Sequence, residues 1–418
     1  MNVPGGRPPA RLWWVAAGSG GLALVAGVVL FSVLAFLVVG VSSGPVDWGE
    51  LLTSSVWDPA SGRFGAAAMV FGSAVVAVVA LALAAPIGWA AALAVNELAP
   101  ARWRRALRSG AELLAVVPSI VYGLLGIAFL RPLVSRLADV PGGDSLLAAA
   151  LVLAVMVLPT IVAVSVDALA SVPDSSREAA FACGLKPTEV ITSAVLPQAR
   201  RGMAAAALLG LARALGETIA VFLVVGRADG RMLHGLGDLW QRLVRPGQTL
   251  TTKLNGPESV LAGTSGAHWA ALCALGLVLL GSVVLLTLLG LRRSASPGAR
   301  GGSPVPKSRW AGRTARDRSS RVLLGASLAV PLALVVAIAA VVASRGRAAF
   351  DPGFWWSPSL GASGGGVRDQ LLGTCVLVGA AGLLAAPVGL GLGLVTGEYA
   401  RPRAGRILRS LTLTLGGV

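Results

Sequence analysis

Long runs of sequence without a charged residue are the feature that most constrains how this chain can fold. Uncharged apolar runs of about 18 residues or more are candidate membrane-spanning helices, because roughly 20 helical residues cross a bilayer. A further apolar segment, 202–226, contains Arg213 and Glu217, and another run begins after Arg409. We therefore predict an all-α, polytopic membrane protein with about eight complete transmembrane helices and the start of a ninth. The uncharged runs lie between residues 11 and 47, 63 and 97, 112 and 131, 144 and 167, 258 and 292, 321 and 345, and 369 and 398.

The low charge content excludes several classes of protein. Only 13% of the residues are charged, whereas a soluble domain carries about 25%, so soluble enzymes, disordered chains and coiled coils are excluded. The net charge of +16 sits in short clusters between the apolar runs, a pattern that argues against nucleic-acid binding. The three cysteines, Cys183, Cys273 and Cys375, have no CxxC spacing and predict neither a disulfide framework nor a zinc site.

The basic clusters also predict an orientation. Placing the N-terminus in the cytoplasm puts the cluster at 102–108, the loop at 171–201 and the segment 292–321 on the same side, and the last contains nine Lys or Arg against one acid. The first uncharged stretch, residues 12–46, is longer than the apolar region of a cleavable signal peptide and predicts a retained helix. We expect a multi-pass protein of the plasma or inner membrane with a cytoplasmic N-terminus.

A linker rich in Gly, Pro, Ser and Arg, residues 292–320, divides the chain into a first unit, 1–291, with six predicted transmembrane helices, and a second unit, 321–418. The two units repeat each other at an offset of 301, and shared Pro, Gly and Glu positions without a gap make chance a poor explanation. Gly72-Ser73 corresponds to Gly373-Thr374, Ala84-Ala85-Pro86-Ile87-Gly88 to Ala385-Ala386-Pro387-Val388-Gly389, and Glu97 to Glu398.

The most specific motif lies in the predicted cytoplasmic loop before the fifth span. It reads Arg177-Glu178-Ala179-Ala180-Phe181-Ala182-Cys183-Gly184, followed after eleven residues by Leu196-Pro197. Asp174 and the polar residues after it predict a helix start with a polar cap and an early acid, and Gly184 predicts its end in a left-handed conformation. The alternative is an ordinary surface loop.

This motif resembles the EAA loop of ABC-importer permeases, with Ala194 where that pattern usually has isoleucine. The resemblance implies the type I ABC importer permease fold. It also implies that the loop docks on a dimer of a cytoplasmic ATP-binding subunit, which hydrolyses the ATP. The residues implied in docking are Glu178, Ala179, Ala180, Gly184, Leu196 and Pro197.

The fifth predicted span carries a second motif, Arg213 followed by Glu217 and Thr218. A charge inside a span costs several kcal/mol unless it is partnered or hydrated, so such residues are usually functional; the alternative is a structural ion pair. The spacing of four predicts that Arg213 and Glu217 lie on one helical face, one turn apart.

The stretch Arg-Ala-x-Gly-Glu-Thr after an EAA loop resembles the permeases of phosphate-specific ABC importers. Residues 1–291 resemble the PstC-type permease, and residues from about 350 onward resemble the start of the PstA-type permease. The resemblance implies phosphate as substrate, an extracytoplasmic phosphate-binding protein as partner, and a substrate pathway containing Arg213, Glu217 and Thr218.

A guanidinium can bind two phosphate oxygens at once and stays charged. We expect Glu217 to pair with Arg213 in the resting state and, during transport, either to accept the phosphate O–H or to screen the arginine. Neither a catalytic residue, a metal site nor a cofactor is expected, and the sequence contains no Walker A motif. The alternatives are an ABC permease for another oxyanion, such as sulfate or molybdate, a secondary transporter driven by an ion gradient, and a membrane scaffold that does not transport.

The repeat also bears on the length of the chain. At the offset of 301, Val117 corresponds to Val418, so the second unit stops where its next span begins. The sequence therefore predicts a fused permease truncated at its C-terminus, and a complete fusion would have roughly 590 residues and about twelve spans.

Overall fold

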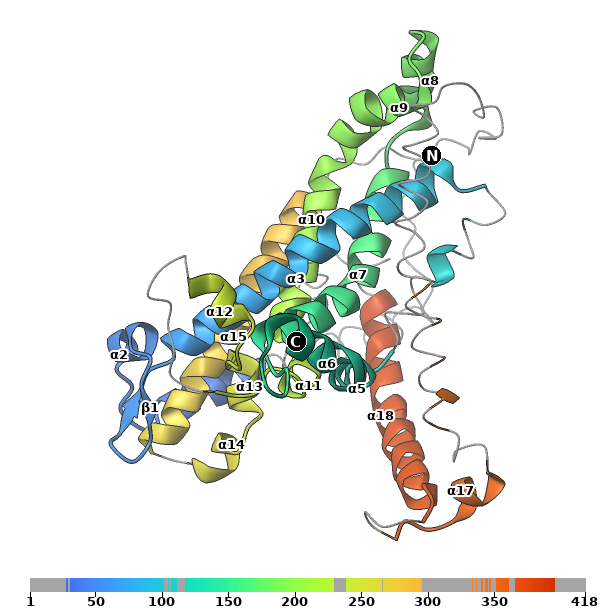
Figure 1. Cartoon of the computed structure of the whole chain (residues 1–418). Coiled ribbons are helices and arrows are strands. Elements are labelled where there is room, and N and C mark those ends of the chain that lie inside the picture. The colour runs from blue at the N-terminus through green and yellow to red at the C-terminus, as the bar shows by residue number, and fades with distance from the viewer. Residues whose placement is uncertain are drawn as a thin grey trace, which may run out of the picture. The chain divides into compact units, whose positions relative to one another are not determined.

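The structure is a computed structural model of the chain (Figure 1). It describes residues 31–100, 107–110, 117–228, 238–264, 266–294, 351–360 and 365–394, together with a few single positions. By their contacts the described residues form two compact groups, whose bounds differ from those of the two sequence units. One group contains those between 36 and 335, and the other contains 31–35 and those from 336 to 394.

Four long helices form the centre of the first unit (Figure 1). Helix α3 packs along α7, and α10 packs against α7, α3 and α15. Within a bilayer every backbone N–H and C=O must be satisfied internally, and continuous helices meet that requirement. The four helices are α3 (Ala67–Leu93), α7 (Leu146–Ala170), α10 (Leu196–Gly216) and α15 (Ala267–Ser294).

Small residues let three of these helices approach closely. Ile161 of α7 lies between Gly88 of α3 and Gly210 of α10: a Cβ added at Gly88 would lie 2.8 Å from Ile161 Cγ2, and one added at Gly210 would lie 2.9 Å from Ile161 Cγ1. The indole Nε1 of Trp89 donates to the carbonyl of Met203 at 3.2 Å, which ties α3 to α10. Close approach through glycine is a usual means of helix association in membranes.

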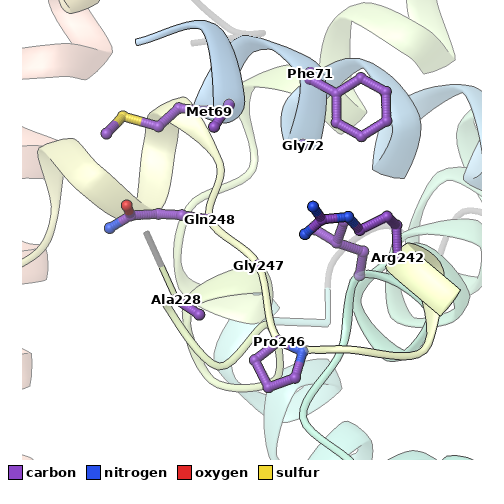
Figure 2. A pocket seen from close by; sticks show the side chains of 10 residues that line it. Met69, Phe71, Gly72, Ala228, Arg242, Pro246, Gly247 and Gln248 are labelled. Carbon is purple, nitrogen blue, oxygen red and sulfur yellow. The ribbon is translucent and has the colours of Figure 1, made fainter. Parts of the chain in front are cut away.

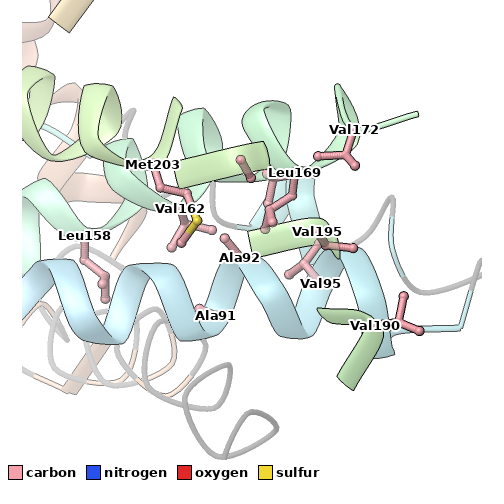
Figure 3. Packing of buried hydrophobic residues seen from close by; sticks show 12 residues of the cluster. Ala91, Ala92, Val95, Leu158, Val162, Leu169, Val172, Val190, Val195 and Met203 are labelled. Atoms are coloured by element: carbon pink, nitrogen blue, oxygen red, sulfur yellow. The ribbon is translucent and has the colours of Figure 1, made fainter. Parts of the chain in front are cut away.

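A buried apolar cluster joins the ends of α3, α7 and α10 to the segment that connects α7 with α10 (Figure 3). Phe181, Leu185 and Leu196 pack against it from that segment and from the start of α10. The buried members of the cluster are Ala91, Ala92, Val95, Leu158, Val162, Val166, Leu169, Val172, Val190, Val195, Ala199 and Met203.

The connecting segment consists of three short helical pieces. Helix α8 (Asp174–Ala182) is followed by α9 (Pro187–Val190) and by a π-helical turn, η3 (Ile191–Val195), which runs directly into α10. Helix α3 also ends in a π-helical turn, η1 (Ala94–Leu98). Figure 1 shows α8 and α9 beyond one end of α10.

A second layer of helix lies beside α7. It is formed by α5 (Ser119–Leu125), the π-helical turn η2 (Gly126–Leu130) and α6 (Arg131–Ala138), which follow one another without a break. The short helix α11 (Ile219–Phe222) packs against α5 and α7. A Cβ at Gly123 of α5 would lie 2.5 Å from Leu223 Cδ1, so the two segments are in close contact.

The opposite end of α3 is covered by short elements. Strands β1 (Trp57–Asp58) and β2 (Arg63–Phe64) form an antiparallel ribbon in which Trp57 pairs with Phe64. The other elements are α2 (Trp48–Thr53), α12 (Leu239–Leu243), α13 (Leu250–Leu254) and α14 (Glu258–Leu261). A separate buried cluster around Leu51, Leu250 and Leu275 holds α2, α13 and α15 together.

Within the described residues, five helices are long and apolar enough to cross a membrane: Ala67–Leu98, Ser119–Ala138, Leu146–Ala170, Ala267–Arg293 and Arg368–Pro387. The all-α prediction is confirmed. The first predicted span appears as a shorter apolar helix, Phe31–Val41. Most of the predicted span at 321–345, the linker at 292–320 and all residues after 394 lie outside the described residues.

The second unit repeats a local pattern of the first. Helix α18 (Arg368–Leu394) begins 301 residues after α3, and Pro387 stands inside it as Pro86 stands inside α3. Before α18, the side chain of Asp351 caps α17 (Pro352–Trp356) by accepting from the Gly353 N–H at 3.0 Å. In the first unit, Asp47 caps α2 through the Gly49 N–H at 2.8 Å.

The turns leading into α3 and α18 share a backbone pattern as well. The N–H groups of residues 65, 66 and 67 donate to the carbonyls of residues 56, 51 and 54. Those of residues 366, 367 and 368 donate to the carbonyls of 358, 354 and 357. The second unit therefore contains the same supersecondary structure as the start of the first.

Candidate functional site

The motif at 177–184 folds as a short helix with a defined beginning and end. Pro173, with φ of −60°, precedes α8, and no side chain caps the helix, so the expected polar side-chain cap is wrong. The early acid is present, since Asp174 lies in the first turn, where a carboxylate is favoured by the helix dipole. Its Oδ1 accepts from Arg177 Nη1 at 3.1 Å.

The predicted end of this helix at Gly184 is confirmed. Gly184 has φ of +81°, a left-handed backbone conformation that residues with a side chain rarely adopt. The Gly184 N–H donates to the Phe181 carbonyl at 2.9 Å, and the Leu185 N–H donates to the Ala180 carbonyl at 3.3 Å. This pair of bonds satisfies the last carbonyls of the helix and turns the chain toward α9.

The structure brings both halves of the motif to one end of the bundle. Ser176 Oγ donates to Gln198 Oε1 at 3.5 Å, which links α8 to the first turn of α10, where Leu196 and Pro197 begin the helix. Ala180 and Leu196 are half-buried against the apolar cluster. The exposed members are Glu178, Ala179, Gly184 and Pro197, and they offer a surface beyond the ends of the long helices.

Sequence reasoning missed a buried ion pair beneath this surface. Arg177, which stands one residue before Glu178, is only 7% exposed. Its Nη2 lies 3.0 Å from Oε1 of Glu97, in the π-helical turn that ends α3. The recurrence of Glu97 as Glu398 in the repeat was the available signal that this acid has a role.

The second motif does not form the continuous helix that its spacing suggested. Helix α10 ends at Gly216, and Glu217 has extended backbone angles, φ −72° and ψ 127°. The prediction that Arg213 and Glu217 share one helical face is therefore wrong. Glu217 Oε1 instead accepts from the Ala220 N–H at 3.2 Å, so this carboxylate satisfies a free N–H at the start of α11.

The three predicted pathway residues nevertheless lie around this break in the helix. Arg213, Glu217 and Thr218 are all half-buried, and among the described residues there is no ion pair between Arg213 and Glu217. The guanidinium of Arg213 is close enough to Tyr122 of α5 to interact with it electrostatically. A break in the helix with a half-buried arginine before it places a charged group beside irregular backbone.

A third feature lies at the other end of the bundle, around Glu258. Its Oε1 lies 3.0 Å from Lys253 Nζ, and its Oε2 lies 2.7 Å from His268 Nε2 and accepts from Trp57 Nε1 at 3.3 Å. Burial raises the pKa of Glu258, but the hydrogen bond and charge of Lys253, with Trp57 and His268 close by, outweigh it and leave the pKa below its usual value.

A small cavity at the same end, of about 30 Å³, lies between the first turns of α3 and the segment 242–248 (Figure 2). Figure 2 shows Arg242 opposite Phe71, and Gln248 below Met69. None of the predicted pathway residues lines this cavity. Its volume is that of a site for water.

Comparison with known proteins decides the family. Residues 84–294, half of the chain, match the family described as "Binding-protein-dependent transport system inner membrane component". The chain belongs to this family. It is thus a multi-pass membrane component of a transport system, and the match covers α7 to α15, both motifs and the Arg177 site.

Several proteins are similar to this chain over roughly half of its length. The probable ABC transporter permease protein YqgH of Bacillus subtilis is 40% identical over 193 residues, which are 46% of this chain and 61% of that protein. The phosphate transport system permease protein PstC of Mesorhizobium japonicum is 32% identical over 263 residues, 58% of this chain and 77% of that protein. PstC 2 of Mycobacterium tuberculosis is 33% identical over 243 residues, 53% and 75% of the two chains.

Proposed function

We propose that the chain is the permease of an ATP-driven importer of inorganic phosphate. The observation that carries this function is the exposed surface of α8, held at one end of a bundle of apolar helices in a family that serves binding-protein-dependent transport. Phosphate as the substrate is supported by the relatives named as phosphate transport permeases. The chain itself carries the substrate and hydrolyses nothing; ATP hydrolysis belongs to a partner.

In this proposal, a dimeric ATP-binding subunit docks on Glu178, Ala179, Gly184 and Pro197. The α8 end then faces the cytoplasm, as does the N-terminus, in agreement with the excess of basic residues in the segments around 102–108 and 171–201. The opposite end, with β1, β2 and α14, faces outward and receives phosphate from an extracytoplasmic binding protein.

The translocation path runs past the break between α10 and α11. Arg213 supplies a permanently charged fork that can hold two phosphate oxygens. Glu217, which caps α11, and Thr218, whose hydroxyl donates to the Gly216 carbonyl at 3.3 Å, line the same break. The caps fix the unwound backbone there and leave the guanidinium available for the anion.

We further propose that residues 321–418 belong to a second permease unit of the PstA type, joined to a PstC-type unit by the basic linker. The start of α18 and its internal proline both lie 301 residues after their counterparts in α3, which supports this assignment, and so do the matching caps at Asp47 and Asp351.

Two measurements test the proposed function. The full chain should co-purify with an ATP-hydrolysing subunit, and Glu178→Arg should abolish that association. Asp167→Asn is the matched control, because it removes an exposed ion pair with Arg108 near the same end of the bundle. If Glu178→Arg retains the subunit as the control does, docking through α8 is wrong.

Phosphate uptake then tests the substrate and the energy source. Arg213→Gln should reduce uptake by about tenfold or more, because a neutral amide cannot replace the charged fork. Glu217→Gln should alter uptake or selectivity as well, and unchanged uptake would remove Glu217 from the pathway. Competition by sulfate or molybdate would indicate another oxyanion, and uptake that persists without the ATPase but collapses with an uncoupler would indicate a secondary transporter.

A further inference from the structure

Arg177 differs from its neighbours in the docking helix. Glu178 and Ala179 are exposed, whereas Arg177 is 7% exposed and points back into the ends of the long helices. Its Nη1 donates to the Val172 carbonyl at 2.6 Å, and its Nη2 donates to the Leu169 carbonyl at 3.0 Å. The guanidinium thus holds the carbonyl end of α7, where a cation is favoured by the helix dipole.

The same guanidinium reaches a third helix. Nη2 of Arg177 donates to Oε1 of Glu97 at 3.0 Å, and the side chain of Glu97 is only 10% exposed. Asn96, which is 3% exposed, donates from Nδ2 to the same Oε1 at 2.7 Å and fixes that carboxylate. Both residues lie in η1, the π-helical turn at the end of α3, and single π-helical turns are often found at functional sites.

The chain connectivity gives this contact its importance. Helix α8 is joined covalently to α7 on one side and, through α9 and η3, to α10 on the other. Glu97, in the turn that ends α3, is 80 residues away in sequence from Arg177, so we expect movement of α8 to reach α3 through non-covalent contacts. Apolar contacts such as those of Phe181 can slide, whereas a hydrogen-bonded buried ion pair fixes one register.

We propose that Arg177 and Glu97 form a clamp that transmits the movement of α8 to α3 during transport. This inference rests on the proposed function, in which α8 docks the ATP-binding subunit. Arg177 acts as a positioning residue that touches neither phosphate nor ATP. Its two terminal nitrogens donate to the Leu169 carbonyl of α7, to Asp174 of α8 and to Glu97 at the end of α3. At the offset of 301, Glu398 holds the position of Glu97, so the second unit carries the same acceptor in its sequence.

The test separates coupling from docking. The full chain is reconstituted in vesicles with its ATP-hydrolysing subunit and binding protein, and phosphate imported per ATP hydrolysed is measured together with the amount of bound subunit. Glu97→Gln keeps the shape and one acceptor oxygen but removes the charge, and Arg177→Lys keeps the charge but not the fork. Both variants should retain the bound subunit, while phosphate imported per ATP falls by about tenfold or more. In Glu97→Gln the buried arginine loses its charged partner, and in Arg177→Lys a single nitrogen cannot hold α7 and α3 as the fork does.

Asp167→Asn is again the matched control, since the Arg108–Asp167 pair is exposed and such pairs contribute little. It should leave phosphate per ATP within about twofold of the wild type. If Glu97→Gln does the same, the clamp has no role in coupling. If both clamp variants lose the bound subunit in proportion to uptake, Arg177 only shapes the docking surface and the inference is wrong.

Glu97→Asp provides a second measurement should Glu97→Gln fail to assemble. It keeps the charge on a shorter side chain and should lose part of the coupling; full coupling would contradict the clamp. Failure of the proposed function is distinguishable, because the wild-type chain would then neither bind an ATP-hydrolysing subunit nor import phosphate.

Discussion

The cluster around Glu258 gives the sharpest prediction for stability. Lys253, 1% exposed, places its Nζ 3.0 Å from Glu258 Oε1 and 4.9 Å from the centre of the Trp57 ring. His268 Nε2 lies 2.7 Å from the other carboxylate oxygen. Replacing Glu258 with glutamine removes the negative charge that this buried ammonium group faces, while keeping the size of the side chain.

The magnitude follows from the burial of Lys253. Breaking a buried ion pair costs about 3–5 kcal/mol, since the remaining charge is uncompensated. Glutamine retains one acceptor oxygen, and Glu258 is itself 18% exposed, so we expect the free energy of unfolding to fall by about 2–3 kcal/mol. Adding Lys253→Met should restore much of the loss, because the double variant removes the buried ammonium group together with the carboxylate.

The effect should depend on pH in a defined direction. The pKa of Glu258 is lowered in the folded protein from its usual 4.5: burial opposes the shift, but Lys253, Trp57 and His268 outweigh it. A lowered carboxyl pKa contributes stability that is fully present above the unfolded value and is lost as the pH falls through the folded value. The difference between wild type and Glu258→Gln should therefore be constant near neutral pH and shrink below about pH 4.5.

Thermal unfolding of the purified chain in detergent, followed by circular dichroism, measures these differences. Glu50→Gln is the matched control at the same end of the bundle. The side chains of Glu50 and Arg63 are 31% and 53% exposed, so their ion pair should contribute less than about 1 kcal/mol. The reasoning is refuted if Glu258→Gln unfolds at the same temperature as the control. It is also refuted if the loss of stability of Glu258→Gln relative to the wild type is unchanged at pH 3.

Two further predictions concern glycines. Gly88→Ala should destabilise the bundle by about 1–3 kcal/mol, because its Cβ would press against Ile161. Gly281→Ala is the control and should have no such effect, since a Cβ there would have no atom within 4 Å. Equal melting temperatures of the two variants would contradict the close packing at Gly88. Gly184→Ala should cost about 1 kcal/mol and loosen the end of α8, while Gly184→Asn should cost less because asparagine tolerates the left-handed conformation. Limited proteolysis at α8 in the two variants checks the second, and identical cleavage would argue against it.

The sequence by itself determined the features that depend on near neighbours. Uncharged runs predicted α3, α7 and α15, because the cost of burying charge in a bilayer depends on composition alone. The end of α8 at Gly184 could be predicted since only a residue without a side chain adopts that conformation freely. The pattern of Glu178, Ala179 and Gly184 likewise predicted the short helix α8, which we propose as the docking helix, because the pattern depends on short spacing.

Only the tertiary structure decided which charged groups meet. The spacing of Arg213 and Glu217 predicted one helical face, but Glu217 satisfies an N–H of α11 instead, and the helix breaks between them. The burial of Arg177 follows only from the tertiary structure, which places the ends of α3 and α7 around it. A buried charge takes its partner from whichever helix end lies nearest, and that proximity is set by packing across the bundle and not by distance along the chain.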